Sequence, residues 1–434
     1  MILLKIFKDI LVKLFSKDSF SKNVIILLTG TLIAQAIPLA ISPVLTRLFT
    51  AENFGLFALY FSISQIMSVF ITGRYEYAII LPEKDEDALN IVALCLSITL
   101  LISVLSTFIL LPFRYFIADL LNKHEIGDYL FLIPVTIFAI GIYTTFNLWF
   151  NRKGYFKNVS FGKIFRSSFS SFFSLGFGLT VLKSAGLIIA DTIGQLVAAF
   201  YLSFKFLRSD KDRIKSISKS GMKEQAKRYI HFPKYNILSG LLEKGSGQAP
   251  VILLTAFFGS SVTGLFSLSQ RVIAAPEGLI SVSIGDVFRQ KASIEFKQNG
   301  NCRKTFLDLF KMLLSISIIP FLILAIFAPF LFAFIFGEEW RIAGNYAQIM
   351  TIMFFLSFVV SPLSNMFIIA EKQKIDLVLQ VVLFAFICIS FVAGYNIFRD
   401  PGIAILLYTI IYSIKYCVEF YLSFRFSKGN PSKM

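Results

Sequence analysis

Apolar residues dominate twelve stretches of this chain, each about long enough to cross a membrane. A spanning helix needs about 20 mostly apolar residues. Lipid cannot hydrogen-bond an open backbone, and a spanning barrel would alternate polar and apolar positions, so continuous runs indicate helices. The predicted helices are residues 24–44, 54–73, 88–111, 129–150, 160–182, 186–206, 233–257, 262–286, 306–336, 345–370, 375–397 and 402–424.

The composition supports this pattern. Hydrophobic residues make up 56% of the chain and charged residues 16%, whereas charged residues form about 25% of an average soluble domain. The mean hydropathy is +0.74. We therefore predict an all-α polytopic membrane protein.

The positions of Lys and Arg predict the topology, because cytoplasmic loops retain positive charge. The segments predicted inside, with the adjoining helix ends, hold 31 Lys and Arg, whereas the outer loops hold 6. This places both termini in the cytoplasm and agrees with an even number of spans. The net charge of +16 is then explained by a collar that faces anionic membrane lipids, so no nucleic-acid partner is needed.

A sequence repeat divides the chain into halves. Residues 45–59 recur as residues 254–268, with seven of fifteen positions identical, including Gly55 and Gly264. Six runs precede the longest basic loop, so the second half starts on the same side and the halves are parallel repeats. The predicted parts are a basic amphipathic interfacial segment 1–23, a bundle 24–206, a linker 207–232, a bundle 233–424 and a tail 425–434.

Motifs for enzymatic chemistry are missing from the sequence. There is no phosphate-binding loop and no nucleophile elbow, so we expect neither ATP hydrolysis nor acyl transfer. The four Cys are scattered, and His124 and His231 lie in loops predicted on opposite sides. We therefore predict a transporter rather than an enzyme, with no metal and no cofactor.

Apart from the Lys and Arg at helix ends that are counted above, five cations lie inside predicted spans. A charge at the centre of a span costs at least about 2.5–3.5 kcal/mol and indicates a wet cavity or a partner. Arg166 and Lys311 lie near predicted cytoplasmic ends, where their side chains can reach water. Lys415 lies four residues before Glu419, so a structural pair and a cavity-lining role are both open. The most informative cations are Lys244 and Arg271.

Polar residues in both halves predict a central site. Run seven carries Glu243 and Lys244 and then two Gly and Pro250, which predicts a broken helix with free carbonyls. Hydrogen bonding between helices is the structural alternative for any single Gln or Ser. The candidate cavity residues are Lys244, Arg271, Lys415, Gln35, Gln65, Gln248 and Gln270, and the candidate ion-coupling residues are Glu277, Asp191 and Glu243.

Several segments carry a family resemblance. PVLTRLFTAENFGLFALYFSI, GRYEYAIILPEKDEDALNIVAL and HFPKYNILSGLL resemble the oligosaccharide flippases, the O-antigen and polysaccharide exporters of the multidrug/oligosaccharidyl-lipid/polysaccharide superfamily. The resemblance implies two six-helix bundles meeting in a V in the bacterial inner membrane. It also implies a polyprenyl-pyrophosphate-linked oligosaccharide as substrate, and a polysaccharide polymerase and a chain-length regulator as partners.

Lys244, Arg271 and Lys415 suit such a substrate, since Lys and Arg bind the oxygens of a pyrophosphate. Two other functions stay open. A cation-coupled multidrug exporter of the same superfamily would be expected to present unpaired acids. A polymerase or ligase of the same pathways would need a sizeable outer loop with catalytic Arg or His, and the outer loops here are short.

Overall fold

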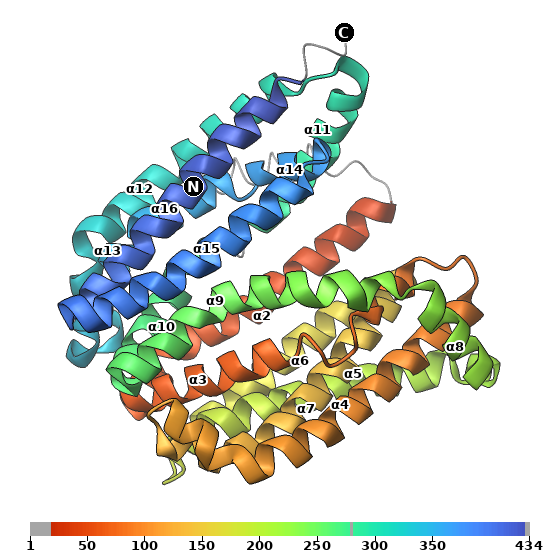
Figure 1. The fold of residues 1–434 in the computed structure, drawn as a ribbon, viewed down its shortest axis with the longest axis horizontal. Helices are drawn as coiled ribbons and strands as arrows, with labels where there is room; N and C mark the ends of the chain where they lie inside the picture. Colours follow the sequence, from red (N-terminus) through yellow and green to blue (C-terminus); the bar gives the residue numbers. More distant parts are fainter. Residues whose placement is uncertain (1–18, 278–280, 430–434) are drawn as a thin grey trace.

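Two helical bundles meet along their inner helices (Figure 1). The computed structural model describes residues 19–277 and 281–429, and these residues contain no β-strand. The first bundle consists of α2 Ser19–Leu48, α3 Ala51–Met67, α4 Asp85–Leu120, α5 Ile133–Arg152, α6 Phe156–Gly178 and α7 Lys183–Ser209. The second consists of α9 Ile237–Phe258, α10 Ser260–Pro276, α11 Val282–Asn299, α12 Arg303–Phe336, α13 Arg341–Val360, α14 Met366–Ile369, α15 Gln373–Ala393 and α16 Pro401–Ser427.

Shorter elements connect these helices. The 3₁₀ turns are η1 Tyr75–Ile80, η2 His124–Asp128, η3 Leu130–Leu132, η4 Lys211–Ser216, η7 Glu338–Trp340 and η8 Leu363–Asn365. Two π-helical turns are η5 Phe232–Asn236 and η9 Gly394–Phe398, and α8 Lys219–Arg228 lies between the bundles in sequence. Each of the twelve predicted runs contains at least one helix, and the second bundle has α11 and α14 in addition, which confirms the all-α fold of two bundles of six spans. The run predicted over 262–286 covers α10, which ends at Pro276, and the start of α11 at Val282, and residues 278–280 between them lie outside the described residues.

The bundles diverge from one end of the molecule to the other (Figure 1). We call the end that carries α8 the linker end. We call the opposite end, which carries residues 46–55 and 255–264, the joined end. The repeat lies there with equivalent geometry, since α3 and α10 are each 17 residues long and begin at Ala51 and Ser260, which are 209 positions apart.

Among the described residues, eight helices are long and apolar enough to cross a membrane. The four predicted spans outside this group are α3, α6, α9 and α10. They carry most of the polar residues singled out in the sequence, and α3, α9 and α10 lie between the bundles (Figure 1). Polar spans in the interior and apolar spans outside are what a bilayer favours.

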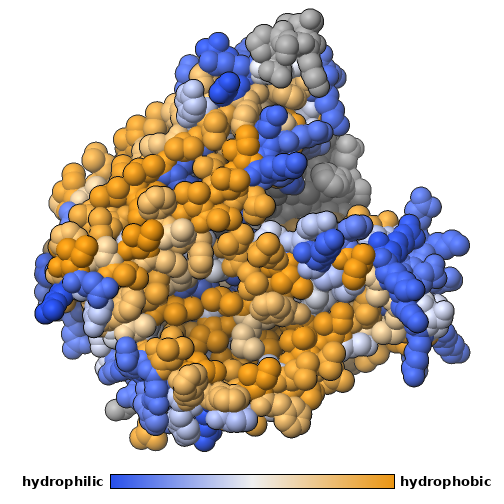
Figure 2. Space-filling view, in the orientation of Figure 1, coloured by the Kyte–Doolittle hydropathy of each residue, from blue (hydrophilic) through white to orange (hydrophobic). Residues whose placement is uncertain are grey.

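The face of the molecule seen in Figure 2 is apolar over most of its area. Large exposed side chains include Leu100 and Phe108 on α4, Ile319 and Phe334 on α12, and Phe386 on α15. Hydrophilic side chains gather at the linker end, around α8 (Figure 2). This distribution fits helices whose outer faces contact lipid and whose ends contact water.

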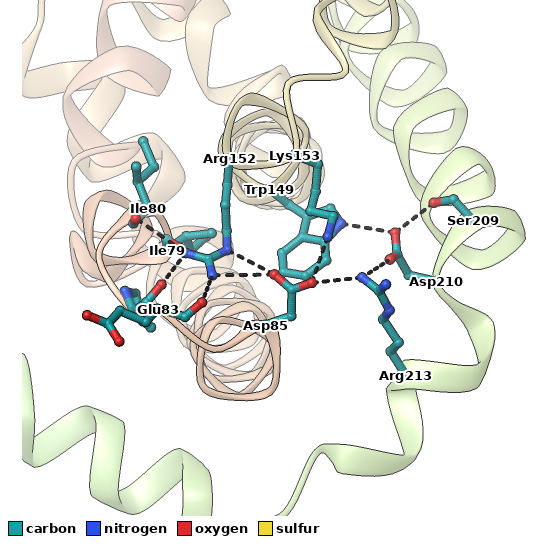
Figure 3. Close-up of polar contacts among 11 residues, drawn as sticks. Ile79, Ile80, Glu83, Asp85, Trp149, Arg152, Lys153, Ser209, Asp210 and Arg213 are labelled. Carbon is teal, nitrogen blue, oxygen red and sulfur yellow. Dashed lines mark hydrogen bonds and ion pairs between the residues drawn. The ribbon is translucent and has the colours of Figure 1, made fainter.

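A polar hub anchors the segment after α7 to the first bundle (Figure 3). The Asp85 carboxylate lies 3.3 Å from Arg152 Nη2, 2.6 Å from Lys153 Nζ and 2.8 Å from Arg213 Nη1. We call these four residues the linker-end hub. Arg152 also donates to four backbone carbonyls of residues 79–83.

The same segment has further contacts with the first bundle. Gln225 Nε2 of α8 donates to Asp87 Oδ1 at 3.1 Å, and Ser218 N donates to Asn90 Oδ1 at 3.0 Å. The part of the predicted linker up to α8 therefore packs as one piece with the first bundle. The exact domain boundaries stay a prediction, and residues 1–18 of the predicted interfacial segment and 430–434 of the tail lie outside the described residues.

The predicted break in run seven is wrong. α9 is a continuous α-helix through Gly245, Gly247 and Pro250, and the irregular turn is the π-helical η5 just before it. Proline removes one hydrogen bond but does not by itself unwind a helix that neighbours hold on both sides. α9 has such neighbours, since it packs against α3, α10 and α15.

Candidate functional site

The two cations singled out in the sequence lie on adjacent helices between the bundles. Lys244 is on α9 and Arg271 on α10. Lys244 Nζ donates to Gln65 Oε1 of α3 at 3.1 Å, and the Arg271 guanidinium lies 6.0 Å from the ring centre of Phe57, also on α3. Both cations of the second half therefore face a helix of the first half.

Arg166 of α6 is a third cation near Lys244 and Arg271. It lies close enough to interact with Lys244 and with Asp191 of α7, and Asp191 also interacts with Arg271. Asp191 is buried, whereas Arg271 is exposed although it lies within a helix between the bundles. An exposed side chain at this position shows that open space reaches it.

Arg74 completes this group from the linker end. It lies between α3 and η1 in a left-handed conformation, with φ of 60°. Its Nη2 packs on the backbone of Gly240 in α9, where a Cβ would lie 1.8 Å away, and it interacts electrostatically with Lys244. A non-glycine residue at positive φ costs on the order of 1–3 kcal/mol, so the surrounding contacts hold Arg74 in this conformation.

We call Arg74, Arg166, Lys244, Arg271, Asp191 and Glu243 the central cluster. It holds four cations and two acids. Among the described residues, Arg166, Lys244 and Arg271 form no ion pair, and the nearest acid to Arg74 is Glu76 at 3.9 Å. The Nε of Arg74 is buried without a hydrogen-bond partner. An excess of incompletely paired cations can bind an anion through charge-assisted hydrogen bonds.

Glu76 lies beside this cluster in η1. Thr72 Oγ1 donates to Glu76 Oε2, and the side chain is buried. Burial raises the pKa of the Glu76 carboxyl, while the hydrogen bond from Thr72 and the charge of Arg74 oppose this shift. Burial disfavours the charged form of a carboxyl, so Glu76 offsets less of the local positive charge than a solvated acid would.

Neutral polar side chains adjoin Lys244. Gln248 Oε1, one turn further along α9, accepts a hydrogen bond from Ser62 Oγ of α3 at 2.8 Å. Gln65 and Gln248, two of the candidate cavity residues, therefore lie on neighbouring helices close to Lys244. Lys163, one turn before Arg166 on α6, donates to Thr31 Oγ1 of α2 at 2.9 Å.

Other predicted site residues lie apart from this group. Lys415 Nζ lies 2.8 Å from Glu419 Oε1 within α16, so of the two roles left open for Lys415 the structure shows the structural pair. Glu277 accepts a hydrogen bond from Ser357 Oγ of α13, at 2.5 Å, inside the second bundle. Glu243 and Gln35 are exposed, and Gln270 is half-buried.

Two residues of the central cluster escaped the sequence analysis. The sequence indicates that Arg166 is a cation near a helix end and that Arg74 is a charge in a loop. The sequence signal for Arg74 was its place directly after a Gly at the end of a predicted span. Neither signal indicates which cations meet, because that depends on how α6, α9 and α10 pack.

The chain is similar to known proteins in sequence and fold. Residues 44–345 match the family model described as "Polysaccharide biosynthesis protein". No curated protein sequence matches the chain.

Three solved structures share the fold. A lipid II flippase MurJ in an inward closed conformation has a TM-score of 0.67 and 16% identity, and the match covers 94% of this chain and 89% of that chain. An inward-facing MATE family transporter of the MOP superfamily has a TM-score of 0.64 and 16% identity, covering 92% and 93%. A MOP superfamily transporter from Pyrococcus furiosus has a TM-score of 0.64 and 14% identity, covering 94% and 96%.

Proposed function

This chain belongs to the polysaccharide biosynthesis protein family, and on that premise we propose that it is a flippase for lipid-linked oligosaccharides. The proposed substrate is a polyprenyl-pyrophosphate-linked repeat unit of O-antigen, capsule or exopolysaccharide. It moves from the cytoplasmic to the periplasmic leaflet of a bacterial inner membrane by alternating access, with the linker end in the cytoplasm. A polysaccharide polymerase and a chain-length regulator stay predicted partners.

The excess of cations in the central cluster carries this proposal. A pyrophosphate brings negative charge and several acceptor oxygens, which Arg and Lys bind with charge-assisted hydrogen bonds. Lys244 and Arg271 come from the second bundle and Arg74 and Arg166 from the first. An anion bound among them contacts both bundles, as a substrate does when two repeats rock around it.

The neutral groups beside the cluster suit the glycan. Each sugar hydroxyl that leaves water without a partner costs several kcal/mol, on the order of 2–7. Ser62, Gln65 and Gln248 provide donors and acceptors next to Lys244. The lipid tail has no need of this path, because the outer faces of the bundles are apolar.

The alternative is a cation-coupled multidrug exporter. The likeness in fold to a MATE transporter keeps it open. The charge of the central cluster opposes it, because a cationic drug would meet four cations and two acids. The two functions therefore differ in the sign of the charge that the site binds.

Binding of charged lipids to the purified protein in nanodiscs tests the proposal. We expect farnesyl pyrophosphate to bind more tightly than farnesyl phosphate, and farnesol least. Arg271→Gln and Lys244→Gln should each weaken farnesyl pyrophosphate binding about ten- to hundredfold, since a charge-assisted hydrogen bond contributes about 1.5–3 kcal/mol. The paired charges of α16 provide a control, and the double variant Lys415→Met/Glu419→Met should bind normally.

The opposite preference would refute the flippase proposal. Tighter binding of tetraphenylphosphonium than of farnesyl pyrophosphate, with no loss in the Arg271 and Lys244 variants, supports the drug exporter instead. A second experiment measures transport in proteoliposomes, with a short-chain polyprenyl pyrophosphate that carries N-acetylglucosamine as substrate.

Asp191, Glu277 and Glu243 stay the proposed ion-coupling residues, and the same vesicles test them. Asp191 is the strongest of the three, because it is buried and interacts with two cations of the cluster. We expect flipping to slow when the proton gradient is collapsed, and Asp191→Asn to remove that sensitivity. Equal flipping rates with and without the gradient in the unmodified protein exclude proton coupling through any of them.

A further inference from the structure

The two copies of the repeat cross each other at the joined end. A Cβ added to Gly55 of α3 would lie 1.8 Å from the carbonyl oxygen of Ser260, and a Cβ added to Gly264 of α10 would lie 1.8 Å from that of Ala51. Ala51 and Ser260 are the same position of the repeat, as are Gly55 and Gly264. The contact is therefore reciprocal, and only glycine permits this approach of the two backbones.

A pair of exchanged hydrogen bonds surrounds the crossing. Asn122, in the turn after α4, donates from Nδ2 to the carbonyl of Ala256 at 3.0 Å. Trp340, in the turn after α12, donates from Nε1 to the carbonyl of Thr46 at 3.1 Å. In each half, the turn after the third long helix thus reaches the chain just before the second helix of the other half.

Additional contacts tighten the same region. Glu52 Oε1 lies 2.7 Å from Lys123 Nζ of its own bundle and accepts a hydrogen bond from Ser260 Oγ of the other bundle at 3.1 Å. The hydrogen bond from Lys123 lowers the pKa of the Glu52 carboxyl. The Trp340 ring packs edge-on against Phe54, with 5.2 Å between ring centres.

We propose that this crossing is the outer gate of the transporter, closed by the contact at Gly55 and Gly264 and latched by the exchanged donors Asn122 and Trp340. The proposal rests on the proposed alternating-access function. Opening separates α3 from α10 at the joined end and frees two backbone carbonyls to water, while the bundles approach at the linker end. Because the latch is reciprocal, each donor contributes to closure independently.

Distances between spin labels test the gate without substrate. One pair, at Leu120 and Glu339, reports on the joined end, and a second pair, at Lys223 and Lys297, reports on the linker end. All four are exposed. The protein lies in nanodiscs, and its four native cysteines are replaced by alanine so that only the labelled sites react.

Gly264→Ala and Gly55→Ala should each lower the ratio of closed to open gate at least tenfold, because a methyl group cannot occupy the space of a carbonyl oxygen. The joined-end distance should lengthen while the linker-end distance shortens. Gly176→Ala is the matched control, since a Cβ there meets nothing within 4 Å, and it should leave both distances unchanged.

Variants of Asn122 and Trp340 test the outer gate if the alanine variants do not fold. Asn122→Gly removes the donor and keeps the left-handed backbone of residue 122, whose φ is 52°, and Trp340→Phe keeps a ring. Each should shift the ratio about two- to tenfold, as the loss of one hydrogen bond does, and their effects should multiply in the double variant.

Two outcomes overturn the gate. One is that the variants give the same distances as Gly176→Ala. The other is that the joined end lengthens with no change at the linker end, which means local distortion. A chain that switches normally but does not bind farnesyl pyrophosphate would refute the proposed substrate and keep the gate.

Discussion

The linker-end hub and the central cluster both contain several cations, but they differ in how completely those cations are paired. In the hub, Arg152, Lys153 and Arg213 all reach one carboxylate, Asp85, and Arg152 also reaches backbone carbonyls (Figure 3). In the central cluster, Lys244 donates to an amide oxygen and Arg271 faces a ring, and neither forms an ion pair within the part of the chain that the structure describes. Cations with satisfied donors hold a structure together, whereas cations with spare donors can bind an anion.

We expect the largest change in stability from a substitution that disrupts the linker-end hub. Asp85→Ala leaves Arg152 and Lys153 largely buried, with side chains 10% and 18% exposed, and without their acid. We expect a loss of about 2–3 kcal/mol in the free energy of unfolding, below the 3–5 kcal/mol of a fully buried pair because Asp85 is partly solvated. Thermal unfolding in detergent measures this as a Tm lower by several degrees.

The control for the hub lies two residues away. Glu83 is exposed, and only its backbone carbonyl contacts Arg152, so Glu83→Ala should leave Tm unchanged. Equal Tm values for the two variants would show that the hub does not stabilise the fold.

Substitutions in the central cluster should not lower the stability of the folded state. Arg271→Gln and Lys244→Gln each remove a cation that forms no ion pair among the described residues, and the loss of Lys244 also relieves its repulsion by Arg74 and Arg166. We expect Tm in the absence of substrate to stay constant or rise, by up to about 1 kcal/mol of stability, while substrate binding falls. A fall in Tm as large as that of Asp85→Ala would mean that these cations are structural.

The paired cation of α16 sharpens this contrast. Lys415→Gln strands the buried Glu419, whose side chain is 4% exposed, so it should lower Tm where the central variants do not. The same substitution type thus separates paired from unpaired cations in one thermal assay.

The smallest effect concerns Glu76, beside the central cluster. Burial raises the pKa of its carboxyl, so above the ordinary value of 4.5 the folded state holds a proton that the unfolded chain has lost. Stability therefore falls as pH rises from 4.5 through the folded pKa. Glu76→Gln should remove this fall, which Tm values measured between about pH 4 and about pH 8 would show. Parallel pH profiles of the two proteins would exclude a raised pKa.

Much of this fold follows from local sequence, for a physical reason. A run of about 20 apolar residues has few alternatives to a helix in lipid, and each of the twelve predicted runs contains a helix. The repeat offset of 209 gave equivalent starts for α3 and α10. The interpretation of run seven failed because the neighbours of α9, and not its own Gly and Pro, decide whether it stays helical.

The site was only partly predictable. Lys244 and Arg271 stand out in the sequence because a charge in a span needs an explanation, and in the structure Gln65 and Gln248 lie near Lys244. Lys415 carries the same signal but lies paired on α16. A sequence shows which residues are charged, and it does not show the distance from one charge to the next across helices.

The amino-acid sequence by itself determined that this chain forms two similar sets of membrane-length helices, because hydropathy and periodicity act over a few turns. The tertiary structure decided which cations share one space, which acid neutralises which base, and where two backbones touch. Those facts arise from contacts between residues far apart in the sequence, such as Gly55 with Ser260 and Trp340 with Thr46. No local pattern encodes such contacts, because they form only when the helices pack.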